Sequence, residues 1–308
     1  MSRKLRSLLA PGAVLVALAG TASPAAADGL PVPFDGATNA GVPSLDGDYR
    51  YSAVSGGRST TALRIATGTG EIQRSLRLRG DFAVPLVAYD STPSGLSADG
   101  RTLALIEPRR RFPRARTTFA LIDAERLRLR DRLTLSGDFS FDALSPDGRT
   151  MYLIHYPQPR DPTAYEVRAY DLRRGRLLPD PIVDPAEPDE PMRGSPMART
   201  SSRGGRWVYT LYVGGDHPFV HALDTVGRTS LCLDLPQRAA RHAWSSRLAI
   251  RGARIQVLYR NRVIASASRR PQAASTGGGP PWAVAALVLS GLVAAVGVRR
   301  AVAVSRNG

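Results

Sequence analysis

Cysteine is almost absent from this chain of 308 residues. The single one, Cys232, lies between two leucines in an apolar, strand-like stretch, where a small hydrophobic side chain would be packed. One cysteine excludes an intramolecular disulfide, so an exported domain of this size would depend on its apolar core and strand hydrogen bonds.

Lysine is equally scarce, since Lys4 is the only one and the rest of the 42 basic residues are arginine. This skew, together with abundant alanine and glycine, is typical of a bacterial genome rich in G and C. The formal net charge of +16 fits a solvated basic surface, or contact with anionic lipid or a cell-wall polymer. The solvated surface is the simpler interpretation, and a nucleic-acid partner is not expected outside the cytoplasm.

Histidine is also rare, with four in the whole chain, at positions 155, 217, 221 and 242. His217 and His221 have the spacing of a helical zinc pair, but Pro218 and the strand-like context place them about 13 Å apart along a strand. No Gly-x-Ser-x-Gly elbow is present, and the Asp-Gly pairs lack the alternating acids of an EF-hand loop. We therefore expect no catalytic residue, no metal site and no cofactor.

The first 27 residues have the three parts of a secretory signal peptide: a basic start, an apolar stretch over Leu8–Ala19, and small residues ending at Ala27. We expect cleavage after Ala27. The sequence predicts a signal peptide over 1–27, followed by an N-terminal linker over 28–40.

A second membrane signal lies near the other end, where residues 282–298 carry no charge. At 1.5 Å per residue these 17 residues nearly cross a hydrocarbon core of about 30 Å. Arg299 and Arg300 follow, which places the 299–308 tail in the cytoplasm by the positive-inside rule. We predict a single-pass protein of the cell membrane, with a Gly/Pro/Ser tether over 271–281 and the bulk of the chain extracytoplasmic.

The same segment resembles a sortase sorting signal. Where such signals have Leu-Pro-x-Thr-Gly, the chain has 273–277 with only Thr276 and Gly277 matching. A retained anchor is favoured over attachment to the cell wall.

The middle of the chain contains a repeat. Leu96–Leu103 recurs 48 residues later as Leu144–Met151, with six of eight positions identical. Weaker copies occur around Ser202–Tyr209 and Ser44–Gly47. Asp-Gly predicts a turn with positive φ at the glycine, and the apolar residues that follow predict a buried strand. A following strand ends each time in an aspartate: Asp123, Asp171 and Asp224.

These motifs resemble the blades of WD40-like and YVTN-type β-propellers, over roughly residues 40–269. The resemblance implies an all-β fold over 41–270, a β-propeller of about five blades: four recognisable repeats and a remnant over Trp244–Ala267. The N-terminal stretch could supply the strand that the remnant lacks and close the ring. Another all-β sandwich is the alternative.

Two further segments stand out. Residues 179–196 contain six prolines and several acids, so they predict an excursion from the third unit rather than a central strand. A loop with five arginines is the candidate anion-binding site, because guanidinium groups bind phosphate in a bidentate fashion. An exposed loop that is charged for solubility is the simpler interpretation. Its arginines are Arg109, Arg110, Arg111, Arg114 and Arg116.

The resulting hypothesis is a cell-surface binding or scaffold module for an envelope protein or an anionic polymer. A hydrolase or lactonase acting at a propeller face is the alternative that the resemblance allows, because such blades host both kinds of protein.

Overall fold

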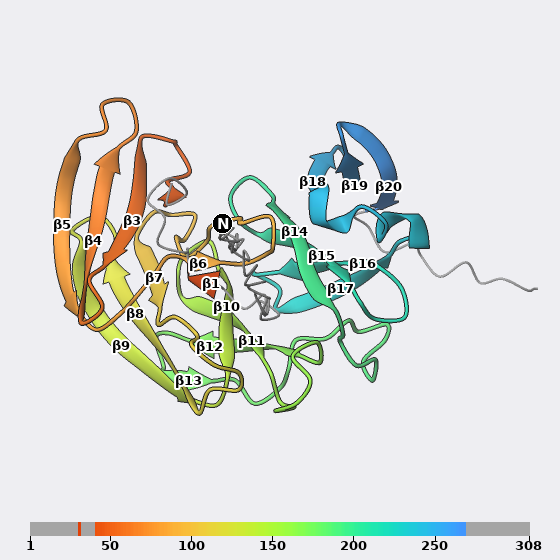
Figure 1. Ribbon diagram of the computed structural model, residues 1–308, viewed down its shortest axis with the longest axis horizontal. Coiled ribbons are helices and arrows are strands. Elements are labelled where there is room, and N and C mark those ends of the chain that lie inside the picture. The colour runs from red at the N-terminus through yellow and green to blue at the C-terminus, as the bar shows by residue number, and fades with distance from the viewer. Residues whose placement is uncertain (1–29, 32–40, 269–308) are drawn as a thin grey trace, which may run out of the picture.

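The computed structural model describes residues 30–31 and 41–268 (Figure 1). Within them the chain forms five successive antiparallel sheets, each built from strands that are neighbours in sequence. The first sheet contains β2 (Val42–Pro43), β3 (Tyr49–Ser55), β4 (Ser59–Ala66) and β5 (Ile72–Arg79). The second contains β7 (Thr102–Ile106), β8 (Arg116–Asp123) and β9 (Arg128–Ser136).

The last three sheets follow the same up-and-down order. The third contains β10 (Phe139–Leu144), β11 (Thr150–His155), β12 (Glu166–Asp171) and β13 (Arg176–Leu177). The fourth contains β14 (Ser195–Ser201), β15 (Trp207–Val213), β16 (Phe219–Asp224) and β17 (Thr229–Asp234). The fifth contains β18 (Ser246–Arg251), β19 (Arg254–Tyr259) and β20 (Arg262–Ser268), after the short 3₁₀ turns Gln237–Ala239 and Ala243–Ser245.

The repeated motif forms the turn that the sequence predicts. In the second sheet Ser97 Oγ donates to Asp99 Oδ1 at 2.6 Å, and the third sheet has the same bond from Ser145 to Asp147, also at 2.6 Å. The glycine that follows has positive φ, 63° at Gly148. The interpretation of the Asp-Gly pairs as turns is therefore confirmed, and the degraded first copy makes the same bond from Ser44 to Asp46.

The strand-ending aspartates close the next turn of each unit. Asp123 accepts the amide hydrogen of Arg126 at 3.0 Å, and Asp171 accepts that of Arg173 at 3.0 Å. Asp224 accepts the amide hydrogen of Val226 at 3.0 Å. These bonds satisfy backbone groups in the turn, which explains why β8, β12 and β16 end in the same residue type.

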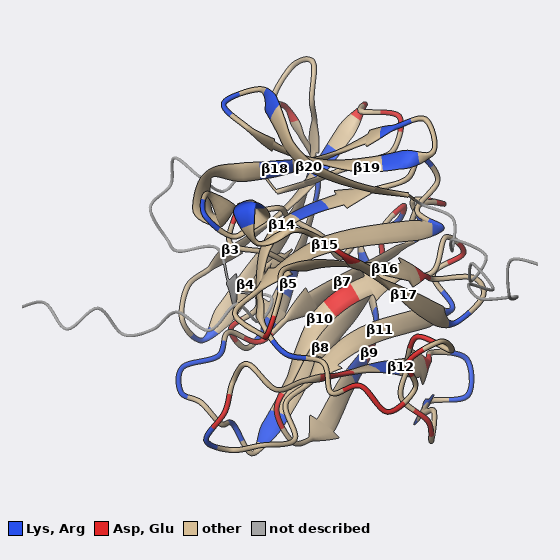
Figure 2. Ribbon diagram, turned by 90° about the vertical axis from the view of Figure 1, so that its right-hand side faces the viewer, with Lys and Arg blue, Asp and Glu red and all other residues tan. Residues whose placement is uncertain are grey.

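Buried side chains fill the space between each sheet and the next. Tyr152 and Tyr209 are the largest of those that are completely enclosed, and both lie in central strands. Four buried clusters each combine residues of consecutive sheets: Leu78 and Ile122 share one, Phe119 and Met151 another, Val167 and Leu223 a third, and Leu211 and Val257 the fourth. Apolar residues therefore form the layers between the sheets, whereas charged residues lie mainly on turns and strand ends (Figure 2).

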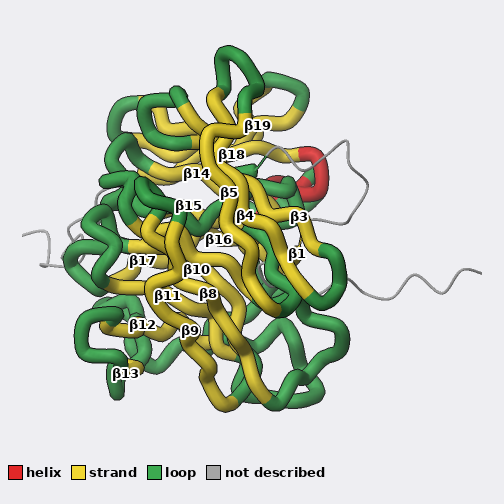
Figure 3. Tube along the Cα trace, turned by 90° about the vertical axis from the view of Figure 1, so that its left-hand side faces the viewer, coloured by secondary structure: helices red, strands yellow, loops and turns green. Residues whose placement is uncertain are grey.

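This radial stack of four-stranded and three-stranded sheets is a propeller-like all-β fold (Figures 1 and 3). Residues Leu30–Pro31 form β1, which pairs with β6 (Pro85–Leu86) beside the second sheet. The predicted completion of the fifth sheet by the N-terminal stretch is therefore not seen at these two residues. Residues 32–40 lie outside the described residues, and closure of the ring stays a prediction.

In the described part of the chain no helix is long and apolar enough to cross a membrane. The predicted signal peptide, the tether over 271–281 and the predicted span over 282–298 all lie outside it.

Candidate ligand pocket

The candidate anion-binding loop is divided by the fold. Arg109 turns inward, where its Nη2 lies 2.6 Å from Asp138 Oδ1, and only 5% and 1% of the two side chains are exposed. Arg114 reaches the same carboxylate, with Nε at 3.3 Å, and burial followed by the charge of Arg109 lowers the pKa of Arg114 to about 10. These two arginines hold the second and third sheets together and are not available to a polymer.

The other three arginines of that loop are exposed. Arg110 makes an ion pair with Asp81 at 2.7 Å while 76% of its side chain remains in solvent. Arg111 lies in the loop, and Arg116 opens β8. The five arginines therefore do not form one exposed patch.

The four histidines lie apart from one another. His155 stacks on Phe139, and His242 stacks on Tyr259 with ring centroids 3.9 Å apart. His221 is buried in β16, and this burial lowers its pKa to about 4, which keeps the ring neutral. In residues 41–268 no group of three histidines, cysteines or carboxylates is arranged to hold a metal ion.

A buried ion pair crosses from the third sheet to the fourth. Arg199 of β14 places Nη1 2.5 Å from Asp142 Oδ1 of β10, with 3% and 5% of the side chains exposed. The same nitrogen donates to Thr210 Oγ1 at 2.8 Å, and the Arg199 amide donates to Asp90 at 2.9 Å. Because water does not reach these groups, we interpret the network as a structural tie between inner strands.

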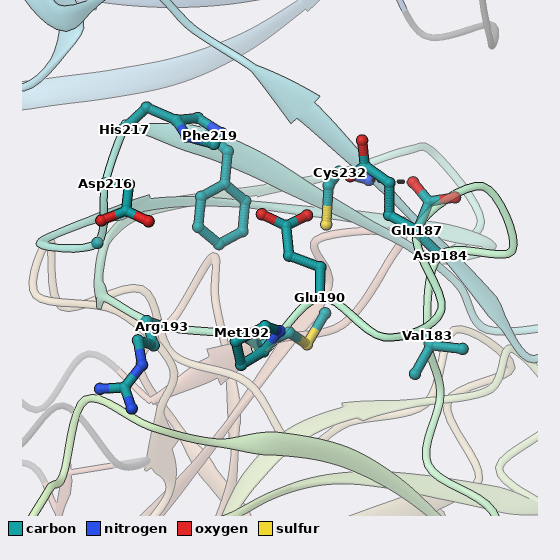
Figure 4. Close-up of a pocket in the computed structure, with 12 residues that line it drawn as sticks. Val183, Asp184, Glu187, Glu190, Met192, Arg193, Asp216, His217, Phe219 and Cys232 are labelled. Atoms are coloured by element: carbon teal, nitrogen blue, oxygen red, sulfur yellow. Dashed lines mark hydrogen bonds between the residues drawn. The ribbon is translucent and has the colours of Figure 1, made fainter.

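A pocket of about 410 Å³ lies between the proline-rich excursion and the fourth sheet (Figure 4). One wall is made by residues 183–193 of the excursion, and the other by residues 215–219 and Cys232. The excursion is held in place on both sides, because Ile182 pairs with Val167 of β12 and the Ser230 amide of β17 donates to the Val183 carbonyl at 3.3 Å.

The floor of the pocket is apolar. Phe219 lies there with Met192 and Cys232, and its ring stacks on Tyr212 at 5.5 Å between centroids. Burial, with the nearby charges of Asp184 and Glu190, raises the pKa of the Cys232 thiol to about 12. A neutral thiol is a poor nucleophile, so the cysteine serves here as an apolar surface.

Carboxylates surround this floor. Asp184 is buried and fixed, because its Oδ2 accepts the Cys232 amide hydrogen at 2.7 Å and its Oδ1 that of Ala186 at 2.9 Å. Figure 4 shows the Glu190 carboxylate directed into the pocket, toward Phe219 and Cys232. A hydrogen bond with Glu190 raises the pKa of Glu187, which indicates that the two carboxyl groups lie close together.

The basic groups of the wall already have partners. Arg193 lies 2.6 Å from Asp161, and His217 Nε2 lies 2.7 Å from Asp234 Oδ1. Among the residues that the structure describes, no ion pair reaches Glu187, Glu190 or Asp216, so the pocket presents net negative charge over an apolar floor. The sequence predicted the excursion but not the pocket, because the opposite wall comes from strands farther along the chain.

Comparisons with known proteins add little to this picture. No family model matches the chain, and no curated protein does. Among solved structures, a hydrazine synthase of Kuenenia stuttgartiensis has a TM-score of 0.41 at 16% identity, over 70% of this chain and 53% of that one. TolB from Acinetobacter baumannii has a TM-score of 0.38 at 19% identity, and the match covers 62% of this chain and 42% of that one. An acylaminoacyl peptidase from Pyrococcus horikoshii has a TM-score of 0.43 at 12% identity, over 70% and 34%.

The chain thus spans about half the length of the first of these proteins, and less of the other two. Likeness at such TM-scores carries no argument about activity. The fold follows from the molecule itself: its repeated Asp-Gly turns and consecutive antiparallel sheets define an all-β, propeller-like repeat protein.

Proposed function

We propose that this chain is an exported, membrane-anchored β-propeller whose pocket binds a basic side chain of another envelope protein. In this proposal the predicted signal peptide over 1–27 and the predicted span over 282–298 would leave residues 41–270 on the outer side of the membrane. About five blades, closed into a ring, would make that domain a rigid support for the pocket.

The observation that carries this proposal is the combination of an apolar floor with carboxyl groups that no ion pair neutralises among the described residues. The aliphatic stem of an arginine or lysine packs well on surfaces such as Phe219 and Met192. Its cationic head would then meet Glu187 and Glu190, where hydrogen bonds between charged groups are the strong ones. A basic peptide segment fits this arrangement better than an anionic polymer does.

The Glu190→Gln variant tests the pocket, because it removes the charge and keeps the shape. We expect it to weaken binding of a short Leu-Arg-Leu-containing peptide roughly tenfold, as for loss of a charge-assisted hydrogen bond. The matched control is Glu71→Gln, at an exposed turn outside the pocket. The measurement is isothermal titration calorimetry with the full chain, using the same peptide with citrulline as a neutral probe.

Equal affinities of the two variants, or of the arginine and citrulline peptides, would reject the pocket as the binding site. The pH dependence gives a further readout. Since the pKa of Glu187 is raised, this group gains its proton at a higher pH than an ordinary glutamate does. The affinity for the arginine peptide is therefore expected to have its full value above the pKa of Glu187 and to fall as the pH decreases through it.

Membrane anchoring has its own test. We expect the processed chain to begin at Asp28 and to remain with the membrane fraction after washing with salt and carbonate, because an apolar span resists both. Cell fractionation with N-terminal sequencing decides this. A product recovered in the medium or linked to peptidoglycan would remove the anchor from the proposal.

A further inference from the structure

A second charged surface, of opposite sign, lies where the first two sheets meet. It surrounds the turn that leaves β5, and on this side β4, β5 and β9 run close to one another (Figure 3). We call it the Gly80 cluster, and its four arginines are Arg58, Arg79, Arg110 and Arg132.

Backbone and side-chain contacts place these arginines around one turn. The Gly80 amide donates to the carbonyl of Arg58 at 2.9 Å, and Arg132 Nη2 donates to the carbonyl of Arg79 at 2.6 Å. Arg110 reaches the turn through Asp81 at 2.7 Å. The backbones of Arg58 and Arg79 and the guanidinium groups of Arg110 and Arg132 thus lie around this turn, and they come from four separate segments.

Their positive charge is largely uncompensated. Asp81 is the carboxylate at this turn, and it is already held by Arg110 and by the hydroxyl of Ser55. In the described part of the chain no ion pair reaches Arg58, Arg79 or Arg132, and all three are exposed. Repulsion between such neighbours is relieved when an anion binds among them.

The cluster is also partly preorganised. The guanidinium of Arg132 lies 5.2 Å from the ring centroid of Phe82, which is itself 2% exposed, and its bond to the Arg79 carbonyl fixes its direction. A guanidinium held in one orientation loses less entropy when it forms a bidentate contact with a phosphate.

The shape of the surface favours a linear partner. β5 and β9 are the last strands of their sheets, so Arg79 and Arg132 lie along sheet edges rather than on a broad face. Small residues, Ser55, Gly56 and Gly57, precede Arg58 in its hairpin, whereas surfaces that enter a bilayer carry large apolar side chains among the basic ones.

We infer that the Gly80 cluster binds a linear, phosphate-bearing polyanion. This goes beyond the proposed function, because it uses other residues, on the first two sheets, and a ligand of the opposite charge. Of the arginine loop, only Arg110 belongs to this cluster. Arg109 and Arg114 are not part of it, because they are buried against Asp138.

The test compares two double variants with the same loss of charge, made in the full chain. Arg58→Ser with Arg79→Ser removes half of the cluster, and Arg251→Ser with Arg262→Ser removes two exposed arginines of the fifth sheet. The probe is long-chain inorganic polyphosphate, with binding measured by fluorescence anisotropy over a range of salt concentrations. The cluster variant should lose roughly tenfold in affinity at low salt and show a shallower salt dependence.

The fifth-sheet variant should stay within about twofold of the unchanged chain. Equal losses in both variants would overturn the inference, since net charge alone would then explain binding. So would the absence of polyphosphate binding, including the case in which phosphatidylglycerol vesicles are bound instead. Unchanged circular dichroism and melting temperature in both variants ensure that the comparison concerns the surface and not the fold.

Discussion

Replacing Arg199 by methionine is expected to destabilise the propeller by about 3–5 kcal/mol, because it leaves the Asp142 carboxylate buried without its charged partner. Arg199 also satisfies Thr210 and the main-chain carbonyl of Asp142, so two further buried acceptors lose a donor. Urea denaturation of the full chain, followed by tryptophan fluorescence, measures the change in the free energy of unfolding.

A matched control is Arg206→Met. The pair of Arg206 with Asp224 is also close, at 2.9 Å, but 58% of the Arg206 side chain is exposed. Asp224 is as buried as Asp142, yet it keeps the amide hydrogen bonds from Val226 and Gly227 after the change, so the loss should cost only about 1 kcal/mol. The double variant Arg199→Met with Asp142→Leu should recover much of the lost stability, because no buried charge is then left unpaired. Similar costs for Arg199→Met and Arg206→Met would contradict the assigned role of burial.

These two ion pairs show where sequence reasoning succeeds and where it fails. Arg206 and Asp224 belong to the repeated unit, and the aspartate at a strand end was identified from the repeat alone. Asp142 and Arg199 lie 57 residues apart in different units, and neither stands out by its neighbours. A contact between sheets depends on how the blades stack, which local propensity does not encode.

The arginine loop shows the same limit. Five arginines within eight positions predict a solvated or anion-binding surface, because Glu107 is the only acidic residue between Asp99 and Asp123. Asp138, which takes up Arg109 and Arg114, lies more than 20 residues farther on, at the entry to the next sheet. Sequence patterns locate charge well, but the fold decides which charges are paired.

One wall of the pocket could be predicted from the sequence, and the other could not. Prolines and acids over 179–196 identified an excursion outside the regular strands, and that segment does form one wall. The floor residue Phe219 and the facing Cys232 lie in strands, and the sequence assigned Cys232 to packing and gave no signal at Phe219. Their role follows only from the position of the excursion across the open side of the fourth sheet.

The second large effect concerns Gly148, in the turn of the third unit. Its φ of 63° disfavours any β-branched residue, and a Cβ atom built there would lie 2.4 Å from Thr102 Oγ1 and 2.8 Å from Thr102 Cβ in the second sheet. Gly148→Val is therefore expected to combine backbone strain of about 1–3 kcal/mol with a similar cost for overpacking between sheets.

Gly100→Val separates these two costs. Gly100 occupies the equivalent turn of the preceding unit, with φ of 71°, but a Cβ atom there meets nothing within 4 Å. Gly100→Val should show the strain alone, whereas the exposed Arg110→Ala should change stability by no more than about 1 kcal/mol. Thermal denaturation of the three variants then ranks Gly148→Val lowest, Gly100→Val next and Arg110→Ala near the unchanged chain. If the two glycine variants melted together, the turn of one unit would not pack on the strand of the unit before it, and the stacking that makes this repeat a propeller would be contradicted.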